Sequence, residues 1–165
     1  MACCGPPVVG RNKGKGPAGS FKPVSVYTPA TDQSPRTAAD VDWIRKASPV
    51  WRTHLMDFDG PFGWSSVSAD GMRKIQTSLK SYESMKWQDI DSKKSCGAIE
   101  LRDVDAKSRA ARTRLVAIGY SQFETLYKLR VDTKSRIWGI RDRHVFQLLW
   151  WDPDHQVYPM NIADN

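Results

Sequence analysis

The densest run of β-forming residues in the chain lies between Thr125 and Pro159. Apolar residues gather there in three groups, which predict strands around residues 126–131, 137–140 and 145–151. The segments between these groups are short and charged, as hairpin connections between adjacent antiparallel strands usually are. Since the third group is almost continuously apolar, we expect that strand inside a sheet, with helices covering one face.

Upstream of this meander, partial alternation of apolar and polar residues predicts a first strand over residues 51–59. An amphipathic helix should follow, with Ser65 or Ser66 as its N-cap. Its apolar face is formed by residues at spacings of three and four, namely Met72, Ile75, Leu79 and Tyr82.

A second helix is indicated from Asp103, a suitable N-cap, through Leu115 to Gly119, a natural stop. Residues 86–103 form a long linker between the two helices. The order strand, helix, helix and three strands predicts an α+β domain, in which a two-helix hairpin packs on an antiparallel sheet of about four strands.

The beginning of the chain has a different composition. Residues 1–48 are rich in Gly, Pro, Ser and Lys, which predicts a flexible basic tail. Within it, Ala38–Lys46 favours a short helix that would dock Trp43 and Ile44 on the domain. Residues 49–165 then form one α+β domain, long enough to bury a core.

The charge of the chain indicates an anionic partner. Its formal net charge is +7 over 165 residues, which favours nucleic acid or an acidic protein, although ordinary solubility charge is the simpler alternative. The three cysteines form no disulfide framework, and the chain has neither an apolar run long enough to span a membrane nor the apolar core of a signal peptide. We therefore expect a cytoplasmic protein without a membrane partner.

Candidate chemistry lies at the end of the meander. His155 and Tyr158 follow the last strand, and both residue types transfer protons in active sites. Arg136 opens the middle strand and Arg130 closes the first, so two guanidinium groups could reach the same phosphodiester. Such a set would suit metal-free RNA cleavage, in which the 2′-hydroxyl attacks its own phosphate and no cofactor is needed.

Three alternatives stay open for these clusters. Asp152-Pro153-Asp154 is also ordinary turn chemistry, in which His155 would only hydrogen-bond the turn. The two aspartates and His155 could instead hold a divalent ion. Trp150 and Trp151 could stack on bases, but alternation in a strand points the two rings to opposite faces.

The second helix carries a basic face, which would suit nucleic acid if it borders the cleft at the end of the meander. A solvated helix face is the usual explanation of such a run. The residues concerned are Lys107, Arg109, Arg112 and Arg114.

The amino-acid sequence of the meander resembles that of the RelE/ParE superfamily of bacterial toxins. The resemblance rests on Leu126-Tyr-Lys-Leu-Arg130, on Arg136-Ile-Trp-Gly-Ile140, on the strand from Val145 to Trp151, and on His155-x-x-Tyr158. The order of the secondary-structure elements is similar over residues 51–160, and the amino-acid sequence is similar over about the last 35 of these residues. Residues 86–103 and the N-terminal tail exceed the usual compact toxin.

The resemblance implies a type II toxin that cuts mRNA on the ribosome and is neutralised by an acidic antitoxin. By position, Arg136 would contact the scissile phosphate, Tyr158 would align the attacking hydroxyl and His155 would act as general acid or base, while Arg112 or Arg114 would add a cation. No small-molecule ligand is expected. The alternatives are a non-catalytic protein that binds nucleic acid or another protein, and a toxin that inhibits gyrase.

Overall fold

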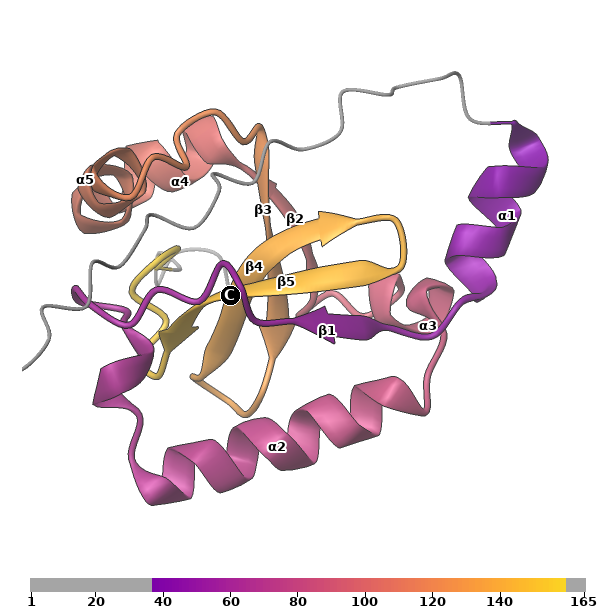
Figure 1. Cartoon of the computed structure of the whole chain (residues 1–165), viewed down its shortest axis with the longest axis horizontal. Helices are drawn as coiled ribbons and strands as arrows, with labels where there is room; N and C mark the ends of the chain where they lie inside the picture. The colour runs from indigo at the N-terminus through magenta and orange to yellow at the C-terminus, as the bar shows by residue number, and fades with distance from the viewer. Residues whose placement is uncertain (1–36, 160–165) are drawn as a thin grey trace, which may run out of the picture. The chain divides into compact units, whose positions relative to one another are not determined.

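The computed structural model describes residues 37–159, which belong to one compact unit. Its strands form a single sheet in the order β1-β5-β4-β3-β2 (Figure 1). The strands are β1 (Val50–Arg52), β2 (Gly97–Glu100), β3 (Thr125–Arg130), β4 (Arg136–Asp142) and β5 (Val145–Asp152). The helices are α1 (Ala38–Lys46), α2 (Ala69–Glu83), α3 (Trp87–Asp91), α4 (Leu101–Lys107) and α5 (Arg109–Ala117), with a short 3-10 turn at Trp64–Ser66.

The three-stranded meander is confirmed. β3 pairs with β4 and β4 with β5, both antiparallel, and β5 lies inside the sheet between β1 and β4. These strands were predictable because each is a contiguous run of β-formers joined to the next by a short polar turn. The α+β class is confirmed with them.

The sheet has five strands instead of about four, and it is mixed instead of antiparallel. β1 pairs parallel to β5, in the register Val50 to Val145. β2 adds a strand at the other edge by pairing antiparallel with β3. Both additions are only three or four residues long, and their pairing partners lie far along the chain or beyond a helix pair, so local alternation hardly marks them.

The expectation that helices cover one face of the sheet is wrong, because both faces are covered. In Figure 1, α2 lies on one side of the sheet and the α4–α5 pair on the other. One core cluster joins α2 and α3 to the sheet through residues such as Ile75, Trp87 and Phe146. The second joins α4 and α5 to the opposite face through Val104 and Leu115. The expected two-helix hairpin is thus replaced by helices divided between two layers.

The N-terminal ends of the helices differ from the prediction in three places, and at one of them α4 begins at Leu101 with Glu100, not Asp103, as its N-cap. Ser65 and Ser66 lie in the 3-10 turn, and Ser68 caps α2 by accepting a hydrogen bond from Gly71 N at 3.0 Å. The second predicted helix divides at Ser108, whose hydroxyl accepts from Ala111 N at 3.3 Å and so begins a new helix, α5. A side chain that caps a backbone N–H favours a helix start over a helix interior.

The predicted strand over residues 51–59 is largely a loop, because the strand ends at Arg52. Leu55 is buried in the core, and Phe58 is 58% exposed. The carbonyl of Leu149, at an irregularity in the β4–β5 pairing, accepts from Asp57 N at 3.0 Å and from the Trp64 indole at 2.8 Å. This loop is therefore held on β5 by hydrogen bonds that the sheet does not use.

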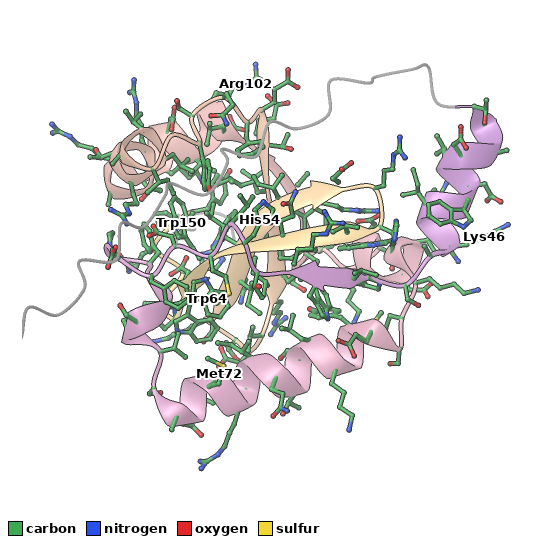
Figure 2. All side chains as sticks on the ribbon, in the orientation of Figure 1. Lys46, His54, Trp64, Met72, Arg102 and Trp150 are labelled. Atoms are coloured by element: carbon green, nitrogen blue, oxygen red, sulfur yellow. The ribbon has the colours of Figure 1, made fainter. Side chains whose placement is uncertain are left out.

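The tryptophans of β5 lie in the two cores. Trp150 belongs to the core beneath α4 and α5, and Trp64 to the one beneath α2 (Figure 2). Trp151 belongs to the same core as Trp64. The prediction that the rings of Trp150 and Trp151 face opposite sides is confirmed. Since they are 0% and 5% exposed, neither offers a free surface for stacking.

The short helix expected at Ala38–Lys46 is present as α1, with Ile44 buried and Trp43 56% exposed. Residues 1–36, the greater part of the predicted tail, lie outside the described residues. Within the described range, no helix combines the length and the apolar character that crossing a bilayer requires.

Candidate functional site

Four charged side chains lie at one end of the sheet, on the face that α4 and α5 cover. β3 places Leu126 in the core on that face, and because strand side chains alternate, Lys128 and Arg130 follow on the same face. Arg136 is the direct cross-strand partner of Arg130, and Asp152 is the partner of Arg136. The end of the sheet thus carries three cations in adjacent positions.

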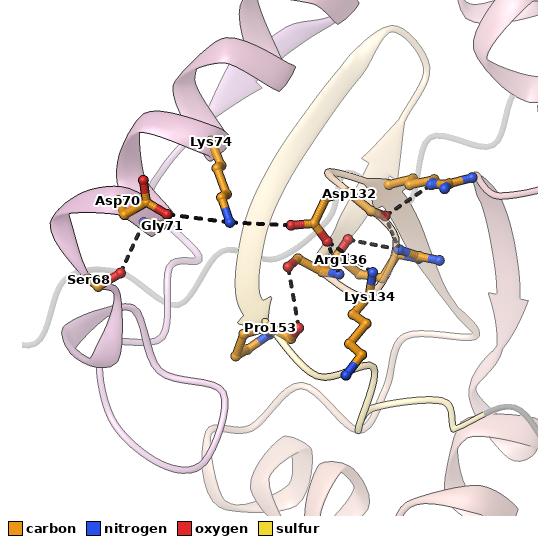
Figure 3. A network of polar contacts seen from close by, with 10 residues as sticks. Ser68, Asp70, Gly71, Lys74, Asp132, Lys134, Arg136 and Pro153 are labelled. Atoms are coloured by element: carbon orange, nitrogen blue, oxygen red, sulfur yellow. Dashed lines mark hydrogen bonds and ion pairs between the residues drawn. The ribbon is translucent and has the colours of Figure 1, made fainter.

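The two arginines are held together by the turn that joins β3 to β4. Arg130 Nε donates to the Asp132 carbonyl at 3.0 Å, and Arg136 Nη1 donates to the same oxygen at 2.9 Å (Figure 3). The Asp132 carboxylate shapes the turn, because its Oδ1 accepts from the backbone N–H groups of Lys134 and Ser135. Like charges directly opposite each other destabilise a sheet, so this arrangement needs a reason other than stability.

Arg136 is the buried member of the pair. It is 7% exposed, and besides Asp132 O its Nη1 donates only to Ser135 O. Its Nε is buried without a hydrogen-bond partner. Burial, and then the charge of Arg130, lower the pKa of Arg136 from its ordinary value. A buried guanidinium with an unpaired N–H can bind an anion by donating this hydrogen bond to it.

The loop after β5 is built on a buried carboxylate. Asp152 is 0% exposed and accepts from Gln156 N at 2.8 Å, Val157 N at 2.9 Å and the Trp138 indole at 3.2 Å. By accepting from these three donors, the carboxylate fixes the turn that carries His155.

His155 has a left-handed backbone, with φ at +59°. A non-glycine residue in this region is uncommon and costs conformational free energy. Its Nε2 is buried and lacks a hydrogen-bond partner. Burial, and then the charge of Arg136, lower the pKa of His155, so the imidazole is neutral at physiological pH and can accept a proton.

Arg136 and His155 line the same pocket, which has a volume of about 280 Å³. The rest of the lining comes from the β3–β4 turn and the loop after β5: Thr133, Lys134, Asp154, Gln156 and Pro159. The pocket is on the scale of a small polar ligand group rather than of a drug-sized molecule. Asp154 is its one carboxylate, and it is exposed.

Tyr158 lies beside this cluster with two lysines against its ring. Lys107 Nζ, at the end of α4, is 4.4 Å from the ring centroid, and Lys128 Nζ is 5.7 Å from it. The charge of Lys128 reaches His155, where it contributes to lowering the pKa. The structure therefore brings together five of the eight residues singled out from the sequence, namely Arg130, Arg136, His155, Tyr158 and Lys107.

The other three predicted residues have different surroundings. Arg114 forms an ion pair with Asp57, with Nε 2.7 Å from Oδ2. Arg109 and Arg112 line a separate pocket of about 620 Å³ with Asp105, which lies 3.9 Å from Arg112 Nε. The basic helix face is thus divided among a structural pair, a second pocket and the cluster at Tyr158.

Lys128 was not singled out from the sequence. Alternation from Leu126 through Lys128 to Arg130 is the signal that could have found it, because it places two cations on one face of β3. The possible metal ligands Asp152, Asp154 and His155 do not form a metal-binding group, and the described range has no cluster of three such residues suited to an ion.

Comparison with known proteins identifies no relative of this chain. No family model, no curated protein and no solved structure matches it.

Proposed function

We propose that the protein is a metal-free endoribonuclease that cuts a single RNA strand at the pocket of Arg136 and His155. One observation carries the proposal. Arg136 Nε and His155 Nε2 are buried without partners, and the two residues line one pocket. Arg130 lies opposite Arg136 across the sheet, and Lys128 precedes it on the same face of β3. A buried polar atom without a partner is costly, so a site that keeps an unpaired guanidinium N–H and an unpaired imidazole nitrogen beside other cations favours an anionic ligand that can also donate a hydrogen bond.

The chemistry follows from the protonation states. Neutral His155 takes the proton of the 2′-hydroxyl, and the 2′-oxygen attacks the adjacent phosphorus while the bond to the 5′-oxygen breaks. Arg136 and Arg130 stabilise the added negative charge on the non-bridging oxygens, and water protonates the leaving oxygen. The products are a 2′,3′-cyclic phosphate and a 5′-hydroxyl end. In this proposal Tyr158 aligns the attacking hydroxyl.

The biological setting is proposed from the resemblance to RelE/ParE toxins together with the charge. The RNA would be mRNA on the ribosome, and the protein would act in the cytoplasm of a bacterium. An acidic antitoxin would neutralise it by covering the cationic cluster, a pairing that the net charge of +7 favours.

The test is cleavage by the purified full chain, with mRNA both free and on programmed ribosomes. The expected product is RNA with 5′-hydroxyl and 2′,3′-cyclic phosphate ends, formed in the presence of a chelator. Arg136→Gln should lower the rate by about 10²–10³-fold, the usual cost of losing one group that stabilises a developing oxyanion. His155→Gln should lower it by about 10²–10⁴-fold.

The matched control is Arg109→Gln, which removes an exposed arginine of α5 that the proposed site does not use. It should leave the rate within about twofold, as expected for a surface charge. If the wild type binds RNA but leaves it intact, the protein is a non-catalytic binder and the proposal is wrong. DNA damage with intact mRNA on induction would instead indicate gyrase inhibition.

A further inference from the structure

Two lysines converge beside the pocket. Lys107 reaches the Tyr158 ring from the end of α4, and Lys128 reaches it from the middle of β3. Elements that are distant in the sequence therefore hold two ammonium groups against one ring. Both lysines are half-buried, which distinguishes them from ordinary solubility charges.

Within residues 37–159, neither lysine forms an ion pair with a carboxylate, and the ring is the partner that each has. Cation–π contacts contribute about 0.5–1 kcal/mol at exposed sites, which does not neutralise two charges. Burial, then Arg136, and more weakly Lys107 lower the pKa of Lys128, while the opposing effect of Cys96 is smaller than that of Arg136. The ammonium groups are thus near enough to each other, and to the guanidinium, for their charges to repel.

We propose that Lys107 and Lys128 form a second phosphate subsite, which holds the phosphate next to the one in the Arg136 pocket. The ligand class is a single nucleic-acid strand with at least two successive phosphates. The inference rests on the proposed function, because it takes the pocket of Arg136 and His155 as the place of the scissile phosphate.

The continuity of the charges favours a nucleic-acid strand over an acidic protein segment. Lys128 connects the second subsite with the arginine pair, because it precedes Arg130 by two residues on the same face of β3 and Arg130 is the cross-strand partner of Arg136. A strand presents one charge at each nucleotide, and a row of neighbouring cations matches that regular spacing. Lysine and arginine are also the residue types that bind phosphate most often, and the row consists of Lys107, Lys128 and the two arginines Arg130 and Arg136.

The experiment measures binding of two uncleavable 2′-O-methyl RNAs to the full chain, a dinucleotide with one phosphodiester and a trinucleotide with two. The wild type should prefer the trinucleotide by about tenfold, well above the twofold that two equivalent registers would give. The slope of log affinity against log salt should be steeper for the trinucleotide by about 0.7.

Lys107→Gln and the Lys107→Gln/Lys128→Gln double variant should lose this preference and the extra slope, while dinucleotide affinity stays within about threefold of the wild type. Lys80→Gln, which removes an exposed lysine of α2, is the control and should change neither. Since Lys128 lies in an interior strand, thermal unfolding of its variant is measured alongside, and Lys107→Gln provides the independent reading.

Equal wild-type affinity for the two RNAs, or equal losses for both ligands in the lysine variants, would overturn the second subsite. A hexaglutamate peptide that binds through the same lysines, without any trinucleotide preference, would overturn it in favour of a protein ligand. Because these RNAs cannot be cleaved, the outcome is separate from the cleavage test. A binder with two subsites and no cleavage would contradict the proposed function and leave this inference standing.

Discussion

Two arginines of this fold have opposite environments. Arg114 is paired in bidentate fashion with Asp57, and that carboxylate also accepts from the Trp150 indole at 2.9 Å. Arg136 is more buried, yet it is held only by backbone carbonyls and faces another arginine across the sheet. A buried arginine matched by a carboxylate stabilises the fold, whereas one left without a carboxylate is available to a ligand.

Removing the carboxylate of the matched pair should have the largest effect. Burial alone would raise the pKa of Asp57, but hydrogen bonds from Arg114 and Trp150 lower it overall, so the carboxylate is ionised in the folded protein. Asp57→Ala leaves a guanidinium and an indole N–H without their partner, and should lower the free energy of unfolding by about 3 kcal/mol. Equilibrium unfolding in urea measures this. A loss below about 1 kcal/mol would show that the pair is not structural.

Arg136→Met should have a much smaller effect on stability, within about 1 kcal/mol, because it removes an unmatched buried charge and relieves repulsion from Arg130. The same variant should abolish the rise in melting temperature that inorganic phosphate produces in the wild type. If Arg136→Met destabilises the protein as much as Asp57→Ala does, the distinction between the two arginines fails.

The difference between these arginines was only partly predictable. Both were singled out from the sequence, Arg114 as part of the basic face of the second helix and Arg136 as the first residue of the middle strand. It could not assign Arg114 to Asp57, since that contact joins α5 to a loop that local alternation assigned to a strand. Arg136, His155 and Tyr158 were predictable as neighbours, because they border contiguous strands whose ends are marked by polar turns.

Elements whose partners are distant in the sequence were likewise not predictable, because local sequence patterns carry no information about those partners. β1 and β2 are too short to show a period of two, and each is stabilised by a strand that is remote or separated by helices. The division of the second helix at Ser108 depends on one capping hydrogen bond. Asp152 was interpreted as a turn residue or a possible metal ligand, and its full burial, with hydrogen bonds that position the loop after β5, could not be predicted from the turn alone.

The environment of His155 beside Arg136 should also make the stability of the fold depend on pH. The pKa of His155 is below its ordinary 6.5, so between these two values the unfolded chain binds the proton that the folded protein lacks. This contribution to stability is present above pH 6.5 and is lost as the pH falls through that window. Melting temperature measured between pH 5 and 7.5 should show the fall, and His155→Gln should flatten it.

Phosphate should oppose this dependence, because a bound anion favours the protonated imidazole. A melting temperature whose dependence on pH is the same in the wild type and in His155→Gln would contradict the assigned environment of His155.

The smallest effect is expected at the carboxylate of the pocket. Asp154 is exposed and lies among the residues that line the pocket of Arg136 and His155. Asp154→Asn removes a charge that repels phosphate and should raise the affinity for the uncleavable dinucleotide by about two- to fivefold at low salt. Asp103→Asn, at an exposed site on α4, is the control. Weaker binding by Asp154→Asn would mean that this carboxylate contacts the ligand favourably.

The parallel pairing of β1 with β5 determines when this protein can become folded during its own synthesis. β1 is among the first described segments to be made and β5 is the last strand, so the sheet stays incomplete until almost the whole domain has been translated. Arg136 and the loop of His155 are likewise brought together only when β5 is in place. A nascent chain therefore cannot assemble the pocket of Arg136 and His155 until β5 has left the ribosome.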